Sequence, residues 1–168
     1  MLKQWIGAAV LAAAVLGGWS ARAVAGDPQL ERGRYLVAII ACGDCHTNGA
    51  LAGKPDMVHF LGGSDIGFAI PGLGYFYGSN LTSDPETGLG NWTREQIVTA
   101  ITRGERPDGR ILAPVMPWHA FGKMTPEDAE AMAAYLQSLP PLKHKAPGPF
   151  GAEEKPTAPY MTMVMPTP

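Results

Sequence analysis

The sequence has few cysteines, little charge and no internal repeat. Only two of its 168 residues are cysteines, which excludes a scaffold held together by several disulfides. Charged residues make up 17% of the chain, and lysine and arginine form no basic run. Nucleic acid and anionic membrane surfaces are therefore poor partners. The length suits one domain with a core of its own.

Residues 1–25 have the three-part layout of a secretory signal peptide. Lys3 precedes an apolar run, and Ala23 and Ala25 fit the small-residue rule for cleavage before Gly26. An uncleaved membrane anchor is the alternative, because the 17 uncharged residues of the run are at the short end of the roughly 17–25 that cross a bilayer. Both interpretations place the folded part outside the cytoplasm.

Three segments have apolar residues at helical spacing and clear start signals. Asp27 caps the first, Thr93 forms a capping box with Gln96 in the second, and Thr125 caps the third. We expect Gly43 to stop the first helix. The expected helices cover residues 28–42, 94–103 and 126–139.

The remaining sequence lacks both the helical and the strand period. Residues 47–91 are rich in glycine, proline, asparagine and aspartate, and predict an ordered loop with turns. A loop of this length is unusual in a compact domain unless it wraps something, and its five aromatic residues, with Trp92 directly after it, favour wrapping over a mobile insertion. The proline-rich residues 141–168 are expected to lie extended over the surface or to be partly disordered.

Cys42, Cys45 and His46 form the pattern Cys-x-x-Cys-His. A thiol–disulfide enzyme would place such a pair at the start of a helix, whereas here it is expected at a helix end. A structural zinc site would need four ligands, and this motif offers three. Covalent haem attachment uses this spacing: the two thiols reach two vinyl groups and the histidine ligates the iron. The sequence predicts one covalently bound haem c, with a buried disulfide beside an incidental histidine as the alternative.

Three stretches resemble class I c-type cytochromes: RGRYLVAIIACGDCHT, NLTSDPETGLGNWTREQIVTAITRGERPDGR and VMPWHAFGKMTPEDAEAMAAYLQSLP. More narrowly, they resemble the haem domains of cytochrome c subunits of bacterial periplasmic dehydrogenases for alcohols, gluconate and aldehydes. The resemblance covers roughly residues 30–140. Many of those subunits carry three such domains in tandem, whereas this chain has one haem motif.

The resemblance implies an all-α fold, in which three main helices and long ordered loops surround one covalent haem. The domain would cover residues 26–140, between the signal peptide and a proline-rich extension over 141–168. In that family the first and last helices cross in close contact. Gly33, Tyr35 and Tyr135 are the matching candidates here.

The resemblance also implies a methionine ligand on the far side of the iron, before the last helix. Met116 fits that position, and Met/His ligation suits electron transfer. Met124 and His119 are alternatives, although Met124 directly precedes a helix cap, where an apolar side chain packs back on the helix. Candidates for hydrogen bonds to the haem propionates, with plain loop structure as the alternative, are Arg110, Asn80 and Trp92. His59 and His144 are expected to be ordinary surface residues.

The implied function is single-electron transfer, not catalysis. The chain would be a subunit or partner of a periplasmic dehydrogenase and would pass electrons to a downstream cytochrome or terminal oxidase. Membrane association would come through the N-terminus or a partner. A haem enzyme or gas sensor with an open sixth coordination site is the alternative. Protein without covalent haem would restore the thiol oxidoreductase interpretation.

Overall fold

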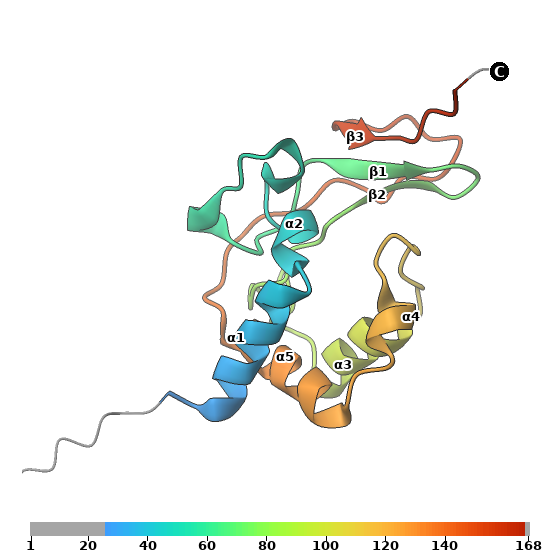
Figure 1. Ribbon diagram of the computed structural model, residues 1–168. Coiled ribbons are helices and arrows are strands. Elements are labelled where there is room, and N and C mark those ends of the chain that lie inside the picture. Colours follow the sequence, from blue (N-terminus) through green and yellow to red (C-terminus); the bar gives the residue numbers. More distant parts are fainter. Residues whose placement is uncertain (1–25, 167–168) are drawn as a thin grey trace, which may run out of the picture.

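The computed structural model describes residues 26–166, so the expected signal peptide lies outside the described residues. The described part contains five α-helices, two short 3₁₀ helices and a three-stranded sheet. The expectation of an all-α fold is wrong, because segments that were expected to be loop or extended chain pair into strands. Figure 1 shows the main helices at one end of the molecule and the sheet at the other. None of the helices within residues 26–166 is both long and apolar enough to span a bilayer.

The three main helices form where the sequence predicts them, and their caps are the expected ones. Asp27 accepts a hydrogen bond from the Gln29 amide at 2.9 Å, and Thr125 accepts one from the Asp128 amide at 3.2 Å. Both halves of the capping box of the second helix are present. The helices are α1 (Pro28–Ile39), α3 (Arg94–Arg103) and α5 (Pro126–Ser138).

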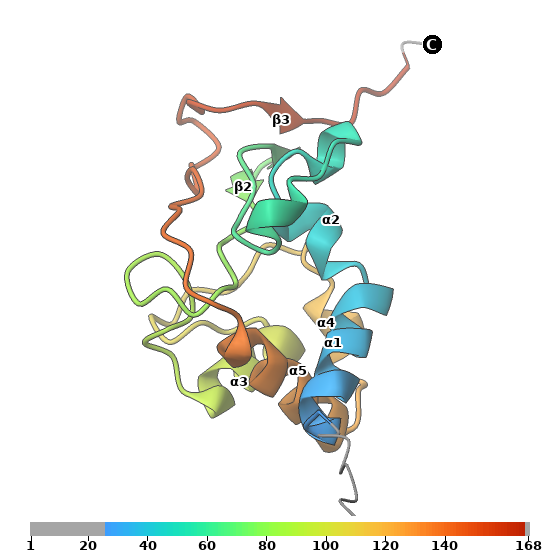
Figure 2. The same ribbon diagram turned by 90° about the vertical axis from the view of Figure 1, so that its left-hand side faces the viewer.

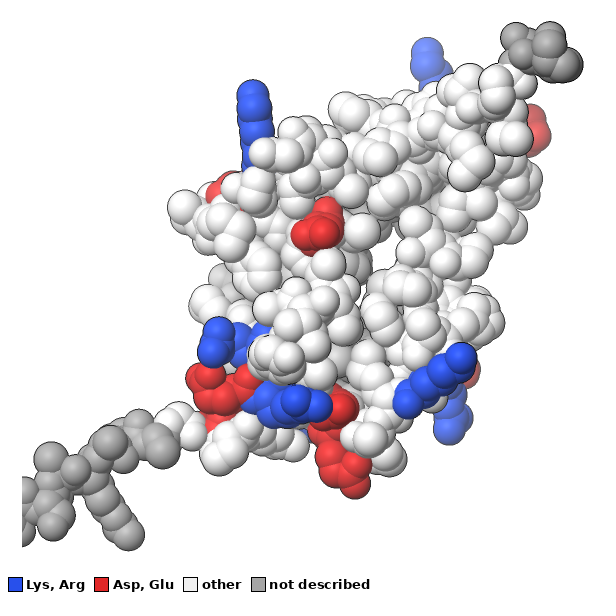
Figure 3. Space-filling model, viewed as in Figure 1, with Lys and Arg blue, Asp and Glu red and all other residues white. Residues whose placement is uncertain are grey.

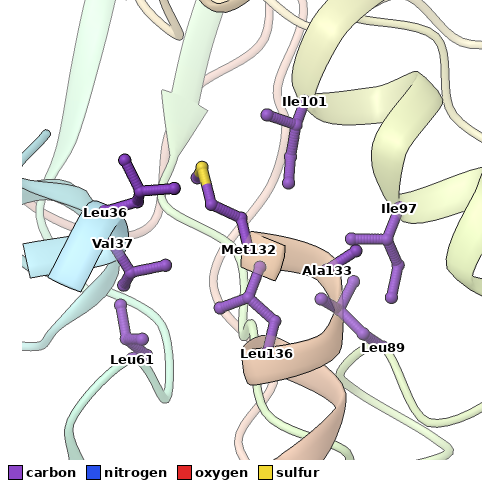
Figure 4. Close-up of a cluster of buried hydrophobic side chains, with 9 residues drawn as sticks. All are labelled: Leu36, Val37, Leu61, Leu89, Ile97, Ile101, Met132, Ala133 and Leu136. Atoms are coloured by element: carbon purple, nitrogen blue, oxygen red, sulfur yellow. The ribbon is translucent and has the colours of Figure 1, made fainter. Parts of the chain in front are cut away.

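Helices α1 and α5 cross at Gly33, where the backbones touch. A β-carbon at Gly33 would lie 1.9 Å from the carbonyl oxygen of Ala131 and 2.7 Å from the β-carbon of Tyr135. The expected contact of Gly33 with Tyr135 is therefore confirmed, while Tyr35 stands exposed beside it. Figure 4 shows the core beside this crossing, with side chains from α1, α3 and α5 and from two loops. Its members are Leu36, Val37, Leu61, Leu89, Ile97, Ile101, Met132, Ala133 and Leu136.

The first helix ends earlier than the sequence predicts. Ala41 adopts the left-handed conformation, with φ at 60°, and a second helix, α2 (Cys42–His46), follows at once. Cys42 therefore begins a helix, and Gly43, expected to stop one, lies inside it. The ring of Phe60 occupies the space beside Gly43, 2.7 Å from where a β-carbon would be.

The sheet is built from three distant segments. β1 (Gly67–Ile70) and β2 (Gly74–Tyr77) form an antiparallel hairpin in which Phe68 pairs with Phe76. β3 (Tyr160–Met161) adds to the other edge of β1 in parallel. The short helices are η1 (Ala50–Ala52), η2 (Met57–His59) and α4 (Trp118–Phe121).

The proline-rich C-terminal segment is extended and packed along the molecule, which is one of the two states expected for it. Figure 2 shows it running from the end of α5 past the loops to β3. The buried side chain of Asn80 donates a hydrogen bond to the Leu142 carbonyl at 2.6 Å. A β-carbon at Gly62 would lie only 2.2 Å from the Leu142 side chain. The segment is thus fitted closely against the loops.

Candidate functional site

Helix α2 brings the whole Cys-x-x-Cys-His motif onto five residues. Cys42 and Cys45 are three positions apart, so they lie on the same face of this helical turn. Both are free thiols and half-buried, and the Cys42 side chain packs against the hydrophobic core. This arrangement presents two thiols side by side with the histidine immediately after them.

The imidazole of His46 is held in one tautomer. Its Nδ1 lies 2.7 Å from the carbonyl oxygen of Ser79, which can only accept, so Nδ1 carries the proton and donates it. Burial lowers the pKa of His46 and favours the neutral ring. A neutral imidazole with Nδ1 occupied in this way leaves the lone pair of Nε2 for a metal ion.

Two loops hold the backbone of this motif. The Gly63 amide donates to the His46 carbonyl at 2.8 Å. Gly78 lies against the other side, where a β-carbon would come within 1.8 Å of the Cys45 carbonyl oxygen. The glycine is therefore required by this close approach. Because the loop through Gly78 also supplies Ser79, the motif and the acceptor of its histidine are fixed together.

The environment of the thiols does not favour redox chemistry. Burial raises the pKa of the Cys42 thiol to about 11, and burial also raises the pKa of Cys45. A thiol–disulfide enzyme needs the opposite shift, toward the reactive thiolate. The sequence predicted the two cysteines at the end of a helix. This prediction is wrong, because α2 begins at Cys42 and includes Cys45. These raised pKa values now provide the argument against a thiol enzyme.

Met116 lies in a turn directly before α4. It is half-buried, and its amide donates to the Ala113 carbonyl at 2.9 Å. Of the alternatives, Met124 packs against the core and His119 is exposed beside the ring of Trp118.

Figure 3, viewed as Figure 1, shows the surface hollowed between the side that carries α1 and α2 and the side that carries α4. The walls of this hollow are almost free of charged side chains.

The three propionate candidates have different roles. The Asn80 amide group is occupied by hydrogen bonds to the Leu142 carbonyl and the Thr87 hydroxyl. Trp92 lies under the guanidinium of Arg106, 4.9 Å from the ring centroid. Arg110 is half-buried, and this burial lowers the pKa of its guanidinium. A carboxylate ligand would compensate for that burial, so Arg110 is the candidate that fits a propionate.

One of the two remaining histidines is the ordinary surface residue that the sequence predicts. His59 is exposed and pairs with Asp56 at 2.6 Å. His144 does not fit that expectation: it is half-buried, with Nδ1 2.8 Å from the Gly62 carbonyl oxygen and Nε2 3.1 Å from Asp65 Oδ1. No local pattern distinguishes His144, because both of its partners come from a loop about 80 residues earlier.

The profile of the cytochrome c family matches residues 30–140, which include most of α1, all of α2 to α5 and the motif on α2. The chain belongs to the cytochrome c family. The resemblance seen in the sequence is thereby confirmed, and membership implies haem c as the cofactor. The two thiols on one turn, the neutral imidazole with Nε2 available and the adjoining hollow with few charged side chains fit that group.

Several curated relatives are cytochrome subunits of bacterial dehydrogenases. The fructose dehydrogenase cytochrome subunit of Gluconobacter japonicus is 36% identical over 130 residues, which are 73% of this chain and 25% of that protein. The cytochrome c subunit of the quinone alcohol dehydrogenase of Gluconobacter oxydans is 35% identical over 151 residues, 88% of this chain and 30% of that protein. The gluconate 2-dehydrogenase cytochrome c subunit of Pantoea cypripedii is 33% identical over 128 residues, 74% of this chain and 27% of that protein. The chain thus spans 25% to 30% of the length of these three relatives.

Proposed function

We propose that this protein is a monohaem cytochrome c that carries single electrons. Cys42 and Cys45 bind one haem c through thioether bonds, and His46 and Met116 are its axial ligands. The arrangement of the two thiols and the oriented imidazole on α2 is the observation that carries the proposal. In each thioether bond Sγ would add to a vinyl carbon and the thiol hydrogen would go to the neighbouring carbon, so no oxidant would be required.

The rest of the chain supports electron transfer rather than catalysis. Bound haem supplies a metal centre that accepts and releases one electron, and Met/His ligation leaves no open position for a substrate. The two thiols of α2 would hold the haem, and Ser79 keeps Nδ1 protonated so that Nε2 would be available as the iron ligand. Met124 packs against the core, which leaves Met116 as the methionine ligand that we propose.

The electron donor that we propose is a periplasmic dehydrogenase, of which this chain is a subunit or a partner. The curated relatives support this, because they are named as cytochrome subunits of dehydrogenases for fructose, alcohol and gluconate. The acceptor would be a downstream cytochrome or a terminal oxidase of the respiratory chain. The layout of residues 1–25 supports export to the periplasm.

The test is to produce the full chain in a host with a cytochrome c maturation system and to measure its haem. We expect one haem per chain that survives denaturation, a reversible one-electron transition, and no binding of carbon monoxide by the reduced protein. The double variant Cys42→Ala and Cys45→Ala should lose the covalent haem. Haem that binds carbon monoxide readily would favour an enzyme or gas sensor instead, and protein without covalent haem would contradict the proposal.

A further inference from the structure

One peptide group joins the C-terminal segment to the haem-binding motif. The carbonyl of Gly62 accepts a hydrogen bond from Nδ1 of His144 at 2.8 Å. The amide of the same peptide group, on Gly63, donates to the carbonyl of His46 at 2.8 Å. Hydrogen bonds in such a chain polarise one another, so the first strengthens the second. His144 therefore acts on the backbone of His46 through a single rigid unit.

A second connection reaches the ring of the same histidine. The Ser79 carbonyl accepts from His46 Nδ1, and the next residue, Asn80, is 2% exposed. The Asn80 side chain donates to the Leu142 carbonyl at 2.6 Å and lies 3.3 Å from the His144 carbonyl. Its own oxygen accepts from the amide and hydroxyl of Thr82. The loop that holds the imidazole is thus fastened to Leu142 and His144 of the C-terminal segment.

We propose that Leu142 and His144 form a clasp that fixes His46 at both its backbone and its ring. His144 and Asn80 are positioning residues: they act on the iron ligand through Gly62, Gly63 and Ser79 without touching it. This inference rests on the proposed role of His46 as the axial ligand. It assigns a role to the C-terminal segment, which lies beyond the residues matched by the family profile.

The clasp affects the redox potential through the basicity of the imidazole. A ring that donates Nδ1–H to a well-placed carbonyl is a stronger ligand, and a stronger ligand favours the ferric iron. Without the clasp contacts, the Ser79 carbonyl and the His46 backbone are no longer held at a fixed separation, so the hydrogen bond between that carbonyl and His46 Nδ1 weakens. The imidazole then becomes a weaker ligand, and the midpoint potential rises.

The experiment compares His144→Ala with Lys143→Ala in the full haem-loaded chain. Lys143 is the neighbouring residue on the same segment, and its exposed side chain pairs with Glu86 at 2.6 Å, so its removal leaves the clasp intact. His144→Asn restores a donor near the position of Nδ1. The two readouts are the midpoint potential, by spectroelectrochemistry, and the hydrogen exchange rate of the Gly63 amide, by NMR of the reduced protein.

We expect His144→Ala to shift the equilibrium with a reference couple at least twofold toward the reduced protein, about 18 mV at 59 mV per tenfold change. Exchange of the Gly63 amide should become at least tenfold faster. Lys143→Ala should match the parent in both, and His144→Asn should recover most of the change. If His144→Ala does not fold, the same readouts on Asp65→Ala, which releases Nε2, decide the question.

Two results would overturn the clasp while leaving the proposed function in place. One is a haem-loaded His144→Ala protein with the parental potential and the parental Gly63 exchange rate. The other is a Lys143→Ala protein that changes as much as His144→Ala, which would show a general effect of the segment. A parent chain that carries no covalent haem would be a different result, since it would contradict the proposed function itself and the clasp with it.

Discussion

Gly33 on α1 and the carbonyl of Ala131 on α5 are in backbone contact, with no room for a side chain between them. A methyl group at Gly33 would lie 1.9 Å from a backbone oxygen that cannot swing aside. Gly33→Ala should therefore lower the free energy of unfolding by roughly 1–3 kcal/mol, as overpacking does, measured by denaturant titration.

The control for Gly33 is the next residue. Arg34 is exposed and pairs with Glu31 on the same helix, so Arg34→Ala should change the free energy of unfolding little. Elsewhere in a helix, replacement of glycine by alanine stabilises by about 1 kcal/mol. An increase in stability for Gly33→Ala would contradict the close crossing.

Gly78 gives a prediction about the haem-binding motif itself. Because a β-carbon there would meet the Cys45 carbonyl, Gly78→Ala should push the loop with Ser79 away from α2. We expect a lower yield of covalent haem, measured by haem staining against total protein. Gly72→Ala is the matched control: its backbone has φ at +76°, which strains alanine, but no atom of the described residues crowds the position within 4 Å. Equal haem yields from the two variants would show that the close approach of Gly78 to the Cys45 carbonyl does not support the motif.

The axial role of Met116 can be tested against Met124. Met116→Ala should open the sixth position, lower the midpoint potential and remove the absorption band that marks sulfur–iron bonding in oxidised c-type cytochromes. The reduced variant should bind carbon monoxide. Met124→Ala should keep the band and lose stability instead, because its side chain packs against the core. The reverse result would assign the ligand to Met124.

The ion pair between α1 and α5 predicts a pH dependence. Nε of Arg32 lies 2.8 Å from Oδ1 of Asp128, and this hydrogen bond and charge lower the pKa of the Asp128 carboxyl. A carboxyl with a lowered pKa in the folded state stabilises the protein above its unfolded pKa of about 3.9, and that contribution is lost as the pH falls through the folded value.

Asp128→Asn should therefore be less stable than the parent at neutral pH, and the difference should shrink as the pH falls below about 4. The measurement is denaturant titration across that range. The Arg32 side chain is 51% exposed and that of Asp128 is 23% exposed, so solvent screens the pair and we expect a small effect. Glu127→Gln, in the same first turn, is the control. A difference between Asp128→Asn and the parent that persists in acid would show that the ion pair is not its cause.

The sequence predicts features that depend only on neighbouring residues, such as the starts of the main helices. Asp27, Thr93 and Thr125 cap helices because each places an acceptor beside free amides of the first turn. The sequence does not predict the break after Ile40, because Ala41, unlike glycine or asparagine, has no preference for the left-handed conformation that it adopts. Packing of α2 against the loops imposes it.

The sheet and the clasp depend on contacts between distant segments. Pro71 and Gly72 between two apolar runs are a turn signal that could have indicated the hairpin of β1 and β2. Nothing local indicates that Tyr160 pairs with Gly67 or that His144 binds Gly62. For the site, the sequence pattern and its context predict the haem-binding motif, whereas its supporting residues Ser79 and Gly78 are visible only in three dimensions.

The bond between His144 and Gly62 joins residues 82 positions apart, which has a consequence for the order of folding. Closing so long a loop costs chain entropy before any contact repays it, so local elements such as α1 and α2 form first. We expect the C-terminal segment to dock last, and the Gly63 amide to become protected late in pulse-labelled hydrogen exchange. Until then the loops that carry Gly63 and Ser79 lack their contacts with this segment, so the support of the haem-binding motif is completed only when the segment docks.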